Sequence, residues 1–150
     1  MRLVVLDAGP LGLVANPKGR PRAVQCRQWA RDLLAAGVRV VVPEIADYEI
    51  RRELLRRGAT ASLQRLDQVK AGLEYDPITT AVMLRAAELW AAARRAGRPT
   101  APPEALDGDC LLAAQALLAA GPGDVVTVAT DNVGHLARFV DARPWETIAP

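Results

Sequence analysis

The stretch RLVVLDAGP, residues 2–10, is a short β-branched apolar run that ends in an acid, Asp7. Such a run predicts a buried strand, and the glycine and proline that follow it predict a turn. A second run of the same kind, VVTVA at residues 125–129, is followed by Asp131 and Asn132. Because open α/β sheets bind their ligands beyond the carboxyl ends of their strands, the polar residues after both runs are candidates for function.

Strands and helices alternate along the rest of the chain. We expect further strands over residues 38–42, 73–75 and 144–148. Helical spacing and capping signals predict helices over residues 23–36, 43–57, 61–72, 78–96, 106–120 and 135–140, with a loop over 97–103. This alternation predicts a three-layer α/β/α sandwich around a central, mostly parallel sheet. We see no internal repeat or domain boundary, so residues 1–150 are expected to form a single domain.

The composition excludes several classes of protein. A hydrophobic fraction of 51% indicates a folded core, and a formal net charge of +2 does not by itself mark a nucleic-acid binder. Cys26 and Cys110 show no metal-ligand spacing, so a disulfide framework is not expected and a reducing compartment is the default. Asp7 interrupts the first apolar run too early for a signal peptide, and no apolar stretch is long enough to cross a bilayer. We therefore expect a cytoplasmic protein without membrane contact.

Three acids occupy positions that favour a shared site. Asp7 ends the first strand, Glu49 lies two turns into the helix after the second strand, and Asp109 lies at the start of a very apolar helix. Carboxylates gathered in one pocket repel one another unless a cation is present, and hard divalent cations prefer oxygen ligands. Such ions activate water and stabilise charge on a phosphodiester. With His135 as the only histidine, a multi-histidine zinc site is excluded.

Each acid also has a purely structural interpretation. Asp107 and Asp109 both suit the positive end of a helix dipole, and Asp107 is a possible N-cap. Glu49 can pair with Arg52 on the helix surface, and Asp131 can cap the turn after a strand. Asp7 is harder to explain in this way, because a half-buried acid without a basic neighbour is costly.

Four stretches of the chain carry a family resemblance. They are VVLDAGPLG, VVPEIADYEIRREL, LDGDCLLAAQAL and VATDNVGHLARF, and together they span nearly the whole chain. In this order the chain resembles the PIN-domain nucleases, especially the short bacterial toxins of the VapC type. The resemblance implies a parallel sheet flanked by helices and a cluster of acids that binds Mg²⁺ or Mn²⁺ and cuts RNA. By position, the implied acids are Asp7, Glu49 and Asp109.

The fourth ligand position is left open by the resemblance. The family often has Thr, any residue, then Asp or Asn, which places Asn132 at that position and Asp131 one step before it. Asp107 is a further candidate. The expected metal ligands are therefore Asp7, Glu49 and Asp109, completed by Asp131, Asn132 or Asp107.

The resemblance also implies partners. We expect a metal-dependent endoribonuclease that is the toxin of a toxin–antitoxin pair, with RNA as substrate and a cognate antitoxin protein. A homodimer is expected because apolar residues on the helices exceed what the core needs, namely Trp29, Leu89 and Trp90. The RNA backbone is expected to meet Arg51, Arg52 and Arg56, or alternatively a second group of Arg94, Arg95 and Arg98.

Three other functions fit parts of the sequence. A non-catalytic or degenerate PIN-fold module that binds RNA or protein is the main alternative, and the presence of all three acids argues against it. A phosphatase with Asp7 as nucleophile needs an acid at position 9, which is Gly, and a late lysine, whereas none follows Lys70. A dinucleotide-binding domain needs three spaced glycines after the first strand, which AGPLG does not supply.

Overall fold

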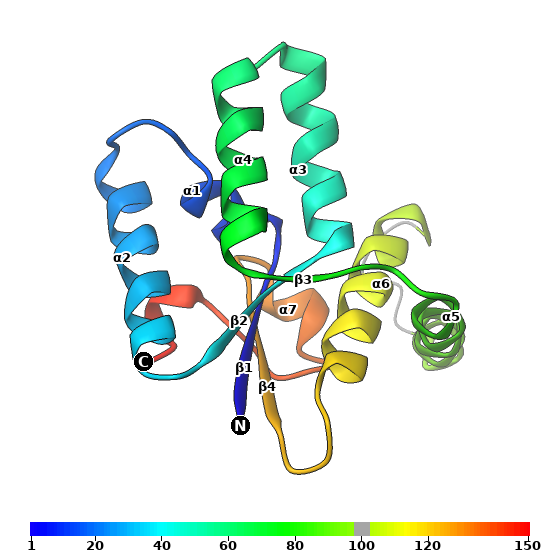
Figure 1. Cartoon of the computed structure of the whole chain (residues 1–150). Coiled ribbons are helices and arrows are strands. Elements are labelled where there is room, and N and C mark those ends of the chain that lie inside the picture. Colours follow the sequence, from blue (N-terminus) through cyan, green and yellow to red (C-terminus); the bar gives the residue numbers. More distant parts are fainter. Residues whose placement is uncertain (98–102) are drawn as a thin grey trace.

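The computed structural model describes residues 1–97 and 103–150, and its centre is a sheet of five parallel strands (Figure 1). The strand order is β3-β2-β1-β4-β5, which puts β1 in the middle of the sheet. The strands are β1 Arg2–Leu6, β2 Arg39–Pro43, β3 Glu74–Asp76, β4 Val125–Ala129 and β5 Ala142–Arg143. The central strand is buried on both faces, as the uninterrupted apolar run LVVL predicts.

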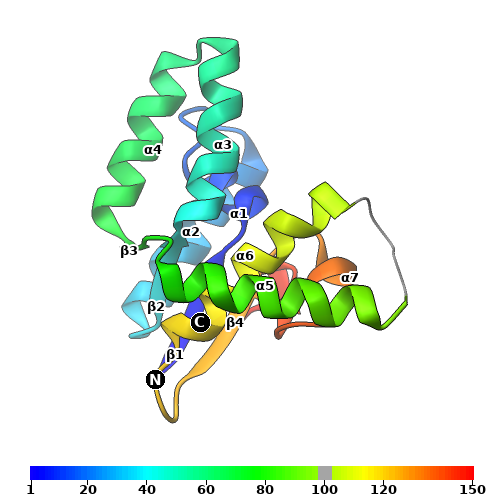
Figure 2. The same ribbon diagram turned by 90° about the vertical axis from the view of Figure 1, so that its right-hand side faces the viewer.

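Helices cover both faces of the sheet, so the predicted three-layer α/β/α sandwich is confirmed (Figures 1 and 2). They are α1 Ala8–Val14, α2 Pro21–Ala35, α3 Glu44–Arg57, α4 Thr60–Gly72, α5 Thr80–Arg95, α6 Pro103–Ala119 and α7 Val133–Leu136. A 3₁₀ turn, η1, spans Trp145–Thr147. Helices α3 and α4 lie side by side as a hairpin that stands beyond the carboxyl ends of the strands (Figures 1 and 2).

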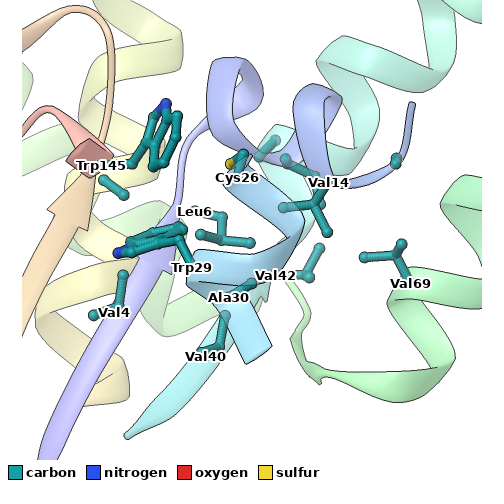
Figure 3. Packing of buried hydrophobic residues seen from close by; sticks show 14 of the residues in the cluster. Val4, Leu6, Val14, Cys26, Trp29, Ala30, Val40, Val42, Val69 and Trp145 are labelled. Carbon is teal, nitrogen blue, oxygen red and sulfur yellow. The ribbon is translucent and has the colours of Figure 1, made fainter. Parts of the chain in front are cut away.

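Alternate residues of β1 pack into two separate hydrophobic clusters, one on each face of the sheet. Val4 and Leu6 pack with the helices of one face in a cluster that includes Trp29 of α2 (Figure 3). Leu3 and Val5 pack against α6 on the other face. Each face therefore has its own hydrophobic layer, and the strand ends between the layers are where polar groups can reach the surface.

Helix α1 replaces the turn expected after the first strand. Asp7 is the N-cap of this helix, and its side chain accepts a hydrogen bond from the Ala8 N–H. Gly9 and Pro10 therefore lie in the first helical turn, where backbone N–H groups have no helical partner and proline removes no hydrogen bond. The turn prediction was wrong because proline is compatible with the start of a helix.

The strand expected over residues 144–148 is also wrong. The last strand is Ala142–Arg143, and Pro144 stops it because proline has no N–H to donate to the ladder. Trp145 then turns into the core, where its ring centroid lies 5.6 Å from that of Trp29. The loop expected over residues 97–103 lies almost wholly outside the described residues.

The expected homodimer depends on whether Trp29, Leu89 and Trp90 lie at the surface of the protein. Trp29 is buried and its indole N–H donates to the Ile148 carbonyl at 2.8 Å, so it belongs to the core and does not support a dimer surface. Leu89 and Trp90 are half-buried. In the part of the chain that the structure describes, no helix is both long and apolar enough to span a membrane.

Candidate active site

Asp7 is fixed at the carboxyl end of the central strand. Its backbone N–H donates to the Ala129 carbonyl of β4 at 2.9 Å, which continues the sheet to this residue. Its Oδ1 accepts from the Ala8 N–H at 2.7 Å, and its Oδ2 accepts from the Thr130 hydroxyl at 2.7 Å. A carboxylate has about four lone-pair positions, so both oxygens keep acceptor capacity while the group is held in one orientation.

Thr130 is a site residue that the sequence reasoning did not select. It is fully buried directly after β4, and besides donating to Asp7 its Oγ1 accepts from the Asn132 N–H at 2.8 Å. The signal was present in the sequence, as the threonine of the Thr-x-Asn pattern. A buried hydroxyl that joins Asp7 to the loop after β4 makes Thr130 a positioning residue.

Glu49 and Asp109 are half-buried, and the Asp7 carboxylate affects the pKa of each. Burial raises the pKa of Glu49, and the Asp7 carboxylate adds to this rise, with a smaller contribution from Asp109. Burial also raises the pKa of Asp109, opposed by His135, and Asp7 again adds to the rise. Glu49 on α3 and Asp109 on α6 line a common groove, and their repulsion by the Asp7 carboxylate indicates that this groove lies near the end of β1.

A glycine allows α6 to approach α3 at this point. A Cβ atom on Gly108 would lie 2.8 Å from Glu49 Oε1, closer than real side chains pack. The space that a larger residue would fill is therefore occupied by the Glu49 carboxylate. This contact explains why a glycine is present in the second turn of a helix that is otherwise rich in alanine and leucine.

Glu49 and Asp109 line a groove of about 460 Å³ between α3 and α6. Asp107, which is exposed, lies in this groove together with Glu49 and Asp109. The groove is lined by Ile45, Tyr48, Glu49, Arg52, Asp107, Gly108, Asp109 and Leu111.

The two candidates for the fourth position are placed differently from these acids. Asp131 is exposed, and its Oδ1 accepts from Arg22 Nη2 at 3.2 Å, an arginine that also binds Glu146 at 3.0 Å. Its Oδ2 lies beside α1, where a Cβ on Gly9 would be only 2.4 Å away. Asn132 is the exposed N-cap residue of α7, and its side chain makes no capping hydrogen bond there.

The donor set fits a hard divalent cation in its chemistry. Within residues 1–97 and 103–150, no three His, Cys, Asp or Glu side chains are close enough together to enclose a metal ion as they stand. Burial nevertheless raises the pKa of Glu49 and of Asp109, and repulsion by the Asp7 carboxylate adds to both rises. A bound cation relieves this repulsion, and carboxylate oxygen is the donor that magnesium and manganese prefer.

The predicted RNA-binding arginines take three different environments. Arg51 binds Asp47 at 2.9 Å and Asp67 at 2.8 Å, and Arg56 pairs with Glu53. Arg52 lines the groove beside Glu49.

In the alternative group, the Arg94 guanidinium lies 5.6 Å from the ring centroid of Trp90, and Arg98 is outside the described residues.

Comparison with known proteins identifies the family. The model of the PIN domain family matches residues 4–133. No curated protein sequence matches the chain.

Similar solved structures come from three bacterial VapBC systems. VapBC2 from Rickettsia felis, bound to a DNA fragment from its promoter, has a chain with a TM-score of 0.71 and 16% identity, covering 95% of this chain and 98% of that one. VapBC-1 from nontypeable Haemophilus influenzae gives a TM-score of 0.63 at 15% identity, covering 97% and 99%. DNA-bound VapBC from Salmonella typhimurium gives 0.60 at 21%, with the same two coverages. At these identities the likeness establishes a shared fold.

Proposed function

The chain belongs to the PIN domain family, whose members are generally hydrolytic nucleases that use divalent metals, and on this basis we propose that it is a metal-dependent endoribonuclease. Asp7, Glu49 and Asp109 hold Mg²⁺ or Mn²⁺ in this proposal. The fourth ligand position is assigned to Asp131 or Asn132, with Asp107 as a further candidate from the groove.

One observation carries the proposal. Glu49 on α3 and Asp109 on α6 line one groove, burial raises the pKa of both carboxyls, and the Asp7 carboxylate adds to each rise. Three acids from segments far apart in the sequence therefore share one electrostatic environment. Placing desolvated like charges together costs free energy, and a cation site is a reason for a fold to keep them.

The residues of the chain have distinct tasks in this proposal. When bound, a divalent cation supplies an activated water and neutralises charge on the phosphodiester. Thr130 holds the Asp7 carboxylate in a fixed orientation through the hydrogen bond to Oδ2. Arg52 puts positive charge into an acidic groove, which offsets the repulsion between the acids and an RNA phosphate.

The solved VapBC structures support a more specific role. We infer that the chain is the toxin of a toxin–antitoxin pair, because three structures with the same fold are VapBC assemblies and two of them are bound to DNA. A cognate antitoxin is the partner in this proposal, and self-association into a homodimer is a further part of it.

Calorimetric titration with Mn²⁺ tests the metal site. The wild-type protein is expected to bind, and Asp109→Asn is expected to weaken binding because it removes one charged oxygen donor. Glu88→Gln is the matched control, since Glu88 is an exposed acid on α5 that pairs with Arg85. If Mn²⁺ does not bind the wild type, or if both variants bind it equally well, the acids do not form a metal site and the degenerate-module alternative is favoured.

A further inference from the structure

An exposed aromatic ring lies next to the acids. Tyr48 precedes Glu49 on α3, and 54% of it is exposed to solvent. A large aromatic side chain gains free energy when it is covered, so a conspicuously exposed ring beside a site is a natural contact for a ligand. Tyr48 lines the same groove as Glu49 and Asp109.

Arg52 lies one helical turn after Tyr48, and its guanidinium lies over the Tyr48 ring. The Arg52 guanidinium carbon is 5.0 Å from the centre of the Tyr48 ring. In contrast to Arg51 and Arg56, which are held by carboxylates, Arg52 has no ion-pair partner among the described residues. Arg52 lines the same groove as Glu49 and Asp109, so its positive charge lies beside these carboxylates.

The groove combines the features that one nucleotide requires. Its volume of about 460 Å³ lies in the range of small-ligand sites. It has an exposed ring for a base, a guanidinium that makes no ion pair within the described residues for a phosphate, and apolar walls from Ile45 and Leu111. Glu49 and Asp109 line the same groove, so a nucleotide held there is next to the proposed reaction centre.

We propose that Tyr48 and Arg52 form a subsite for one unpaired nucleotide of single-stranded RNA, in which Tyr48 stacks on the base and Arg52 binds the adjacent phosphate. The subsite rests on the proposed ribonuclease function and assigns to Tyr48 and Arg52 the task of holding one nucleotide beside Glu49 and Asp109. A base inside a duplex has both faces covered, so only an unpaired base can stack on the ring. Stacking accepts every base, so Tyr48 selects for single strands without selecting a sequence.

RNA binding tests this subsite directly. The probe is a short labelled single-stranded RNA, and its anisotropy is measured with Asp7→Asn protein in Mg²⁺ so that it stays intact. Tyr48→Ala in this background is expected to weaken binding about tenfold, whereas Tyr48→Phe keeps the ring and is expected to stay within about twofold. Leu55→Ala is the control, because Leu55 is 61% exposed on the same helix but does not line the groove.

Two further arms identify the contacts. A set of RNAs is prepared in which each RNA lacks the base at one position. At one of these positions, loss of the base is expected to weaken binding to the protein that keeps Tyr48 but not to Tyr48→Ala. The reason is that loss of the base and loss of the ring remove the same stacking contact. Arg52→Ala is expected to weaken binding and to reduce the slope of log affinity against log salt by about one phosphate contact. Arg31→Ala, on the exposed surface of α2, is the charge-matched control.

The outcomes separate the subsite from the function on which it rests. If Tyr48→Ala and Leu55→Ala bind RNA equally well while the wild type still cuts it, the subsite is refuted and the ribonuclease proposal stands. If Tyr48→Ala impairs only self-association or capture of a protein partner, the groove is a protein interface and the subsite is likewise refuted. If the wild type neither binds nor cuts RNA, both proposals fail.

Discussion

Gly108→Ala is expected to raise thermal stability and to lower RNA cleavage. Alanine suits the interior of a helix better than glycine does, and Gly108 lies within α6 with an ordinary φ. The added methyl group, however, would lie 2.8 Å from Glu49 Oε1. The flexible Glu49 side chain can move aside, so the substitution is expected to displace the Glu49 carboxylate and to leave the backbone in place.

The structure gives a magnitude for each effect. Ordinary contact begins near 3.4 Å, so the Glu49 oxygen must retreat by about 0.6 Å. A misplacement of about 1 Å in a catalytic group can cost about a hundredfold, which places the expected loss of RNA cleavage between about tenfold and a hundredfold. Helix propensity favours alanine by up to about 1 kcal/mol, which corresponds to a rise in Tm of about 2–4 °C.

Single-turnover cleavage of a labelled RNA and thermal melting of the same preparations measure the two effects. Gly72→Ala is the matched control, because Gly72 is the last residue of α4 and a Cβ on it would meet no atom within 4 Å. The control is expected to keep full activity. The reasoning is refuted if Gly108→Ala cuts RNA at the wild-type rate, or if it loses activity only because it is unfolded.

Three further results are expected. Thr130→Val removes the hydroxyl that donates to Asp7, so it is expected to lower cleavage about tenfold and to destabilise the fold by about 1–2 kcal/mol in urea unfolding. Asn132→Ala is expected to weaken Mn²⁺ binding more than Asp131→Ala does in calorimetry, because the Asp131 carboxylate is already paired with Arg22 of α2. The reverse order would assign the fourth position to Asp131. In excess chelator, Asp109→Asn is expected to raise Tm near neutral pH, since the pKa of this carboxyl is raised by burial and its ionised form therefore costs stability above that pKa. The gain should shrink as the pH falls through the raised pKa and the native carboxyl takes up its proton, whereas a gain that is independent of pH would contradict this cause.

The sequence predicted what depends on local apolar pattern. Uninterrupted β-branched runs identified β1, β2 and β4 and therefore the parallel sheet, and the acid after β1 was recognised by its position alone. The first helix was missed because Gly9 and Pro10 are typical of turns, although Asp7 caps that helix. Residue type and spacing predict which strands and helices form, but glycine and proline occur both at the start of a helix and in a turn.

Contacts between distant segments could not be predicted in the same way. Thr130 meets Asp7 across 123 positions of the chain, and Gly108 is needed only because Glu49 lies against it. Similarly, Arg51 and Arg52 are neighbours in the sequence, yet one is bound to carboxylates and the other lines the groove. Such differences arise from packing of α3 against α4 and α6, which periodicity does not encode.

Cleavage of a labelled single-stranded RNA by the wild type and by Asp7→Asn, each in Mg²⁺, Mn²⁺ or excess chelator, tests the central claim most directly. Circular dichroism first confirms that both proteins are folded. The account predicts cleavage by the wild type only when a divalent ion is present, and a loss of at least about a hundredfold in Asp7→Asn. Undiminished cleavage in excess chelator, or equal cleavage by Asp7→Asn, would contradict the claim that these acids form a metal-dependent ribonuclease site.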